Sequence, residues 1–286
     1  MIFLECVGAM IMYTNGSHVT HTAMALRFDG ELYVVESQVA GIQKTKWADL
    51  LKQAEDSSFL VVWLPLNAEK RAQLDEKAAN DFSIQTEGLP WGFHNLMYGW
   101  FDTANDNWPP LLPKELLPVA FKVFEDLKPK LADIFFTQAL NKRLGTEGKN
   151  ISEIAELAAK QGMSVEDVMA MVEQDGWEYS GIEPKEGQAY SCATYVAAMY
   201  KAAGLFGDDY VNGTEFTPRD VYSLVFFDTE TARPDACVTA DPTSPFCQLL
   251  GEYRITLPGY NSVQSYAHMN EHCTIYWQSY DRDTGC

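Results

Sequence analysis

Several absences narrow what this chain can be. Its 286 residues contain no run of about 18 apolar residues, the length that spans a membrane, so we expect no transmembrane segment. Basic residues are few, with 21 Lys and Arg against 40 Asp and Glu, and the formal net charge is −19. Nucleic acids and anionic membranes bind proteins through clustered basic residues, so we expect neither as a partner.

The common catalytic motifs are also missing. The sequence contains no G-x-S-x-G, no H-E-x-x-H, no phosphate-binding glycine loop and no dinucleotide fingerprint, and we therefore expect no cofactor. His268 and His272 have the i, i+4 spacing of a metal-binding pair. No further ligand set accompanies them, so we predict no metal site. Cysteine chemistry is the possibility that remains.

Cysteines are concentrated near the end of the chain. Four of the six lie in the last 50 residues, which is typical of a disulfide-stapled segment in an oxidising compartment. We expect the local pairs Cys237–Cys247 and Cys273–Cys286. This favours a secreted or lysosome-like protein.

Two further signals of secretion are weak. Residues 1–12 have no basic start and are interrupted by Glu5, unlike a signal peptide. Three triplets would accept N-linked glycans in a secreted protein, and they begin at Asn15, Asn150 and Asn212.

The most informative stretch runs from Gln188 to Gly204. Ser191 can cap the start of a helix, alanines fill its interior, and Gly204 stands where a left-handed C-terminal residue is favoured. Cys192 then lies in the first turn, where the helix dipole and free N–H groups lower the pKa of a thiol. A buried structural cysteine is the alternative interpretation.

Residues 19–38 predict a β-hairpin. Asp29-Gly30 is a strong two-residue turn signal between runs rich in apolar and β-branched residues. If these two residues are the whole turn, Phe28 pairs with Glu31, and the register of the remaining residues follows.

This register selects among the histidines. It places His21 opposite Gln38, with Glu36 one diagonal away on the same face, within reach of a long side chain. His21 is therefore the candidate base and Glu36 its orienting partner, with Gln38 as the rival to Glu36. Ala23 and Ala25 share the face and would leave room for the cysteine helix. The five histidines are His18, His21, His94, His268 and His272, and His18 would point to the opposite face.

Between these two blocks the sequence predicts several elements. We expect a helix over 41–54, a buried strand over 59–66 and a polar helix over 67–82. The segment 89–108 crowds aromatic residues among glycines and suggests an irregular loop. Residues 111–180 read as a helical insertion that could form a lid, and its acidic character argues against DNA binding.

The aromatic segment supplies candidate substrate contacts. As a cleft wall it would present Trp91, His94 and Tyr98 to a substrate, with Tyr190 beside the cysteine. The alternative is a loop that its aromatic residues pin to the core. For an oxyanion, the backbone N–H of Cys192 is the natural donor, and Tyr190 or Gln188 could supply a second.

Three short blocks carry a resemblance to a known family. They are Ser17-His-Val-Thr-His21-Thr-Ala-Met-Ala-Leu, Leu32-Tyr-Val-Val-Glu36-Ser and Tyr190-Ser-Cys192-Ala-Thr-Tyr-Val. Together and in this order they resemble the circularly permuted branch of the papain-like, NlpC-type cysteine hydrolases. That superfamily includes bacterial amidase-like proteins and lecithin–retinol acyltransferases. The resemblance implies Cys192 as nucleophile, His21 as base and Glu36 as the polar third residue.

These observations lead to one interpretation. We expect an α+β protein whose permuted papain-like core is a small antiparallel sheet packed on the cysteine helix. Its single domain, 1–286, would comprise a β-rich half over 1–66, the helical insertion over 111–180, the nucleophile helix over 188–204 and a cysteine-rich tail over 205–286.

The expected function is a thiol hydrolase. It would cleave an amide bond in a peptide, small-molecule or acyl substrate through an acyl-enzyme on Cys192. A thiol acyltransferase or lipid esterase on the same fold is one alternative, and a non-catalytic binding module is another. The oligomeric state is left open.

Overall fold

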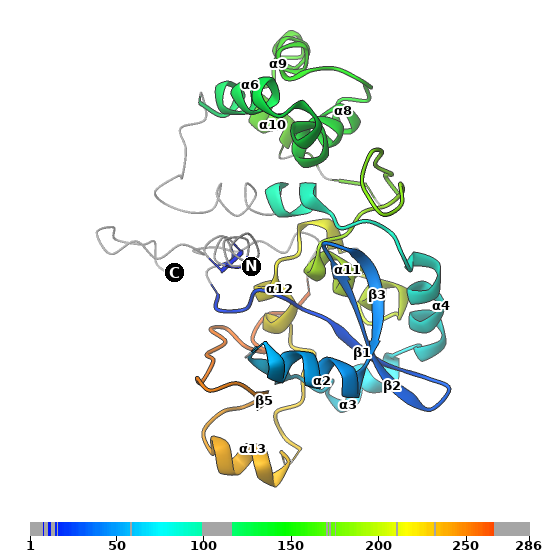
Figure 1. Ribbon diagram of the computed structural model, residues 1–286, viewed down its shortest axis with the longest axis vertical. Coiled ribbons are helices and arrows are strands. Elements are labelled where there is room, and N and C mark those ends of the chain that lie inside the picture. The colour runs from blue at the N-terminus through cyan, green and yellow to red at the C-terminus, as the bar shows by residue number, and fades with distance from the viewer. Residues whose placement is uncertain are drawn as a thin grey trace, which may run out of the picture.

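The structure is a computed structural model that describes residues 8, 11–12, 15, 17–57, 59–98, 116–169, 171, 173–174, 176–209, 211–231 and 233–265. It is a mixed α+β fold with a three-stranded antiparallel sheet and a second, two-stranded sheet. In Figure 1 a helical region lies at one end, the larger sheet and the cysteine helix in the middle, and the second sheet toward the opposite end. The expected α+β class with a small antiparallel sheet is confirmed.

The larger sheet is built around the predicted hairpin. Its strands are β1 (Met24–Phe28), β2 (Glu31–Gln38) and β3 (Gly41–Lys46), with β2 in the centre. Phe28 pairs with Glu31, so Asp29 and Gly30 are the whole turn, as expected. Both have positive φ, 49° and 83°, as the favoured two-residue hairpin turn requires.

The first strand is shorter than predicted. Residues 19–23 lie outside any strand, and β1 begins only at Met24. At Thr22 the backbone N–H bonds to the sulfur of Cys192. The N–H of Thr22 is therefore engaged at the start of α11 and not in pairing with β2.

The prediction of a helix over 41–54 is wrong in its first half. Residues 41–46 form β3, and only then does α2 (Trp47–Asp56) begin. Gly41 has φ +110° and pairs with Gln38, so the chain turns straight back along β2. Pairing with a neighbouring strand overrides the local helical pattern here.

The next two predictions need correction as well. In place of a buried strand over 59–66 there is a three-residue strand, β4 (Val61–Trp63), with Phe59 62 % exposed beside it. It pairs with β5 (Cys247–Leu250) at the edge of the protein. The predicted helix over 67–82 is two helices, α3 (Ala68–Gln73) and α4 (Glu76–Thr86), because Asp75 caps a new helix start.

The helical character predicted for 111–180 is confirmed between Leu117 and Met169, and the described residues from 171 to 180 contain no helix. Its elements are α6 (Leu117–Leu127), α7 (Pro129–Ala132), the π-helical turn η2 (Asp133–Thr137), α8 (Gln138–Arg143), α9 (Ile151–Lys160) and α10 (Val165–Met169). They surround an apolar core of their own that includes Phe136, Leu140 and Ile154. Figure 1 shows these helices in green, apart from the sheet.

The cysteine helix, α11 (Cys192–Ala202), matches its predicted bounds and caps. Ser191 accepts a hydrogen bond from the backbone N–H of Thr194, and Gly204 has φ +76° just beyond the helix end. The helix is almost wholly buried and contacts β2. A small antiparallel sheet packed on the cysteine helix is therefore what the structure contains.

The face of the sheet that meets α11 is not the predicted one. Met24, Leu26 and Val35 share a buried apolar cluster with the helix, whereas Ala23 and Ala25 are exposed. Met24, Leu26 and Val35 lie on the opposite face of the sheet from the two alanines. This face packs on α11 because burying these larger side chains removes more apolar surface from water than burying two alanines would.

Beyond α11 the chain continues as η3 (Gly213–Glu215), α12 (Pro218–Ser223), α13 (Asp235–Ala240) and β5. The predicted disulfide Cys237–Cys247 is present and joins α13 to the start of β5. Cys6, Cys273 and Cys286 lie outside the described residues, and so does the second predicted pair.

Two other sequence signals can be placed on the structure. The side chains of Asn15 and Asn212 are 1 % exposed, so neither can accept a glycan in the folded protein, whereas Asn150 is exposed at the start of α9. Within the described ranges, no helix is both long enough and apolar enough to cross a membrane.

The disulfide generates a first prediction. Replacing Cys237 and Cys247 together by alanine should lower the free energy of unfolding by about 2–3 kcal/mol, the chain-entropy value for a loop of this length. Urea titration followed by tryptophan fluorescence measures the change. The thiol reactivity of Cys192 should stay unchanged, because the groups that lower its pKa, in His21, Thr22 and Ala193, lie outside the stapled segment. An equal stability for the doubly substituted protein would contradict the structural role of this disulfide.

Candidate active site

Cys192 is the first residue of α11 and is 4 % exposed. Among the described residues it is the one cysteine outside the disulfide. Its sulfur is hydrogen-bonded to the side chain of His21 and to the backbone N–H groups of Thr22 and Ala193. Three donors thus converge on one sulfur at the start of a helix, an environment that favours a thiolate.

His21 joins the cysteine to a buried carboxylate. Its Nε2 lies 2.6 Å from Oε2 of Glu36, whose side chain is 3 % exposed on β2. Since Nε2 is engaged by the carboxylate, Nδ1 is the ring nitrogen left for the sulfur. The structure therefore brings together Cys192, His21 and Glu36 in a line, from the start of a helix, the segment before β1 and the middle of β2.

The three groups shift one another's pKa. Burial disfavours a charge on His21, but hydrogen bonds to Cys192 and then Glu36 outweigh it and raise its pKa to about 10. Burial likewise raises the pKa of the Cys192 thiol, yet the hydrogen bond and charge of His21 bring it below its usual range. The side chain of His21 is 41 % exposed, so water screens the ion pair in part.

Glu36 stays ionised despite its burial. Burial alone would raise its pKa, but the hydrogen bond and charge of His21, with smaller contributions from Gln38 and Gln43, hold the pKa below its usual range. Its second oxygen, Oε1, has no partner at hydrogen-bonding distance within the described part of the chain. The carboxylate therefore depends chiefly on the imidazole for its compensation.

Gln38 and His18, the alternatives to Glu36 and His21, occupy other positions. Gln38 lies next to the carboxylate of Glu36 and lowers its pKa, so it supports the carboxylate. His18 is exposed, and its Nδ1 lies 3.3 Å from the hydroxyl of Thr256. Neither replaces Glu36 or His21 in the line that leads to Cys192.

Asn95 belongs to the site, although sequence reasoning missed it. It is 3 % exposed, and its Oδ1 accepts a hydrogen bond of 3.2 Å from the backbone N–H of Ser191, the cap of the cysteine helix. The approach is close because Gly92 has no side chain. A Cβ there would stand 2.0 Å from Oδ1 of Asn95 and 2.9 Å from the nitrogen of Ser191.

Of the predicted substrate contacts, Trp91 and Tyr190 lie beside the cysteine. They form an isolated parallel bridge, and the hydroxyl of Ser37 donates to the carbonyl of Tyr190 over 2.6 Å. The backbone N–H of Tyr190 donates to Pro90, so it is not free to act as the second oxyanion donor proposed above. Gln188 was the other candidate for this second donor, and its side-chain oxygen accepts a hydrogen bond from the hydroxyl of Tyr190.

The other two predicted contacts, His94 and Tyr98, are placed elsewhere. His94 is fully buried, stacks on Tyr179, and lies 3.0 Å from the carboxylate of Glu173. Tyr98 is 4 % exposed under the guanidinium of Arg143, 3.9 Å from its ring. Both belong to the core of the helical region, so the prediction that they line a substrate cleft is wrong. His94 and Tyr98 face this core because the helical segment 93–98 packs its apolar side against it.

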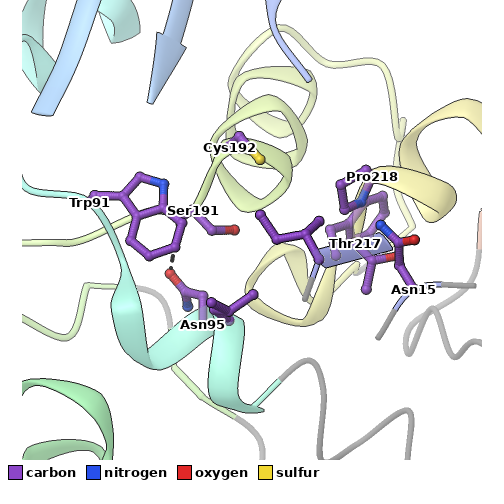
Figure 2. A pocket seen from close by; sticks show the side chains of 10 residues that line it. Asn15, Trp91, Asn95, Ser191, Cys192, Thr217 and Pro218 are labelled. Carbon is purple, nitrogen blue, oxygen red and sulfur yellow. Dashed lines mark hydrogen bonds between the residues drawn. The ribbon is translucent and has the colours of Figure 1, made fainter. Parts of the chain in front are cut away.

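A small cavity opens beside the sulfur of Cys192. Its volume is about 30 Å³, and its walls are Ile11, Asn15, Trp91, Asn95, Leu96, Ser191, Cys192, Phe216, Thr217 and Pro218. Figure 2 shows the sulfur pointing into the space between Trp91 on one side and Pro218 on the other. The cavity therefore gives a small molecule access to the thiol.

Within the described ranges no three His, Cys, Asp or Glu side chains cluster as metal ligands. His268 and His272, the one pair whose spacing suggested a metal, lie outside these ranges.

The contact between Gly92, Asn95 and Ser191 generates a second prediction. Replacing Gly92 by alanine should cost about 1–3 kcal/mol, because the new Cβ overlaps Asn95 and the start of α11. Urea unfolding of Gly92→Ala, Asn95→Ala and the double variant forms a double-mutant cycle. If Asn95 is the obstacle, the double variant is more stable than the sum of the single effects. Simple additivity would show that the two residues do not meet as described.

Comparison with known proteins adds no assignment, since no family model, no curated protein and no solved structure matches the chain.

Proposed function

We propose that this protein is a thiol hydrolase that cleaves an amide bond through an acyl-enzyme on Cys192. The observation that carries the proposal is the line of contacts from the Cys192 sulfur through His21 to Glu36, with 2.6 Å between the imidazole and the carboxylate. A nucleophile, a base and a group that orients the base are the three parts that covalent acyl transfer requires.

The contacts support a definite sequence of steps. The Cys192 thiolate would attack the carbonyl carbon, and the imidazolium of His21 would give its proton to the nitrogen as the carbon–nitrogen bond breaks. The acyl group then remains as a thioester on Cys192. Water attacks the thioester and gives its proton to His21, the acid departs, and the thiolate–imidazolium pair is restored.

Each remaining group has a place in this scheme. Glu36 would hold the imidazole ring by accepting a hydrogen bond from Nε2 and would stabilise its charge. The first-turn position of Cys192 offers its own backbone N–H to the oxyanion. A permuted papain-like arrangement would account for a base that precedes the nucleophile helix, and an oxidising, secreted or lysosome-like location would suit the disulfide.

Trapping the acyl group tests the proposal. The protein is mixed with a panel of acyl and peptidyl p-nitroanilides, quenched in acid and digested, and the peptide that contains Cys192 is weighed. We expect this peptide to gain the mass of the acyl group, and we expect no gain in His21→Ala. No adduct and no released nitroaniline across the panel, from protein that is folded by circular dichroism, would favour the non-catalytic binding module.

The carboxylate generates a third prediction. Glu36→Gln keeps the shape and an acceptor oxygen but loses the charge, so kcat should fall about tenfold to a thousandfold with KM nearly unchanged. Activity needs the imidazolium and should decline as pH rises through its pKa near 10. Without the carboxylate the imidazolium is less stable, so the alkaline limb of the pH–rate profile should move to lower pH.

Gln38→Ala is the matched control, because Gln38 lies beside Glu36 and contributes less than His21 to the lowered pKa of that carboxylate. It should keep the alkaline limb close to that of the unaltered protein. A wild-type profile for Glu36→Gln together with a crippled Gln38→Ala would assign the orienting role to Gln38.

A further inference from the structure

We propose that the cavity beside Cys192 selects the acyl group of the substrate, and that it accepts small, uncharged acyl groups of about two or three heavy atoms. This inference rests on the proposed function and adds a substrate class to it. Four features of the cavity carry it: its position relative to His21, its charge, the state of its polar groups and its size.

The position of the cavity assigns it to the acyl side. Its walls include Ser191 and Cys192, but neither His21 nor Glu36. The leaving nitrogen must lie near the imidazole, because it takes its proton from there. The acyl group is then directed away from His21, into the cavity between Trp91 and Pro218 toward which the sulfur points in Figure 2.

Among the described residues, the walls carry no charged side chain apart from Cys192. None of the ten residues is Asp, Glu, Lys, Arg or His, and half of them are apolar: Ile11, Trp91, Leu96, Phe216 and Pro218. A charged acyl group placed here would lose its hydration without gaining a counter-ion, which is strongly unfavourable. The cavity therefore excludes anionic and cationic acyl groups.

Most polar groups on the walls are already in use. The amide of Asn15 donates a hydrogen bond and accepts another within its own turn. Ser191 caps α11, and the hydroxyl of Thr217 caps α12. The exception is Asn95, whose Nδ2 is buried and has no acceptor among the described residues. The walls thus offer an apolar surface with one spare amide donor, which suits a neutral group with at most one acceptor.

The size of the cavity sets the length of the acyl group. Its volume is about 30 Å³, and one water-sized group needs about 10–15 Å³ on this measure. An acetyl group, which has three heavy atoms, fits, whereas a long acyl chain would have to displace Trp91 or Phe216. Both side chains are packed, at 5 % and 3 % exposure, so such displacement is costly.

An acyl-ester series tests this proposal. Hydrolysis of p-nitrophenyl acetate, butyrate, octanoate and monosuccinate is measured, each rate is divided by the ester's own alkaline hydrolysis rate, and Cys192→Ser serves as the blank. Acylation of the Cys192 peptide is confirmed by mass. We expect kcat/KM for the acetyl ester to exceed that for the octanoyl and succinyl esters at least tenfold.

A pair of matched variants adds a local test. Phe216→Leu enlarges the cavity and should raise the butyryl-to-acetyl ratio of kcat/KM several-fold. Phe136→Leu makes the same substitution at a phenylalanine buried in the separate apolar core of the helical region, which does not include Phe216, and it should leave the ratio unchanged. If either variant fails to fold, the series on the unaltered protein still decides.

The outcomes separate this inference from the function on which it rests. If octanoate or succinate acylates Cys192 as efficiently as acetate, the size and charge selection is overturned while the acyl-enzyme stands. If no ester acylates Cys192, the thiol hydrolase and its acyl specificity are overturned together.

Discussion

The contact between the start of α11 and the residues before β1 determines the chemistry of the candidate site. A helix N-terminus presents free N–H groups, and a residue in its first turn feels the positive end of the dipole. Here the segment that contains His21 and Thr22 leaves the sheet and meets that turn at the sulfur of Cys192. If β1 had continued in register to residue 19, the N–H of Thr22 would be committed to sheet geometry.

Burial alone would favour the neutral form of each group in the line. Burial opposes the charge on Cys192, His21 and Glu36 in every case, and the hydrogen bonds among them reverse its effect. Each of the three charges therefore depends on the others. Removing one of the three side chains leaves a neighbouring charge buried without a compensating partner. This coupling supports reading the three residues as one functional unit.

Features encoded within a few residues could be predicted from the sequence. Asp29-Gly30 determined the hairpin register, and Ser191 and Gly204 marked both ends of the cysteine helix. The pairing of His21 with Glu36 followed from that register, although His21 itself lies before the strand. Features that depend on distant contacts were missed. Asn95 meets Ser191 across 96 residues, and no local pattern joins them. β3 is a strand because β2 lies beside it, and His94 is buried because the helical region covers it.

The alkylation rate of Cys192 as a function of pH tests the central claim most directly. Brief iodoacetamide treatment at a series of pH values, followed by mass spectrometry of the Cys192 peptide, reports the fraction of thiolate at this one cysteine. The thiolate–imidazolium pair predicts a midpoint below the usual cysteine pKa, and His21→Ala should move the midpoint upward. Identical profiles for the two proteins, with a midpoint at or above the usual value, would contradict the account and leave Cys192 as a buried structural residue.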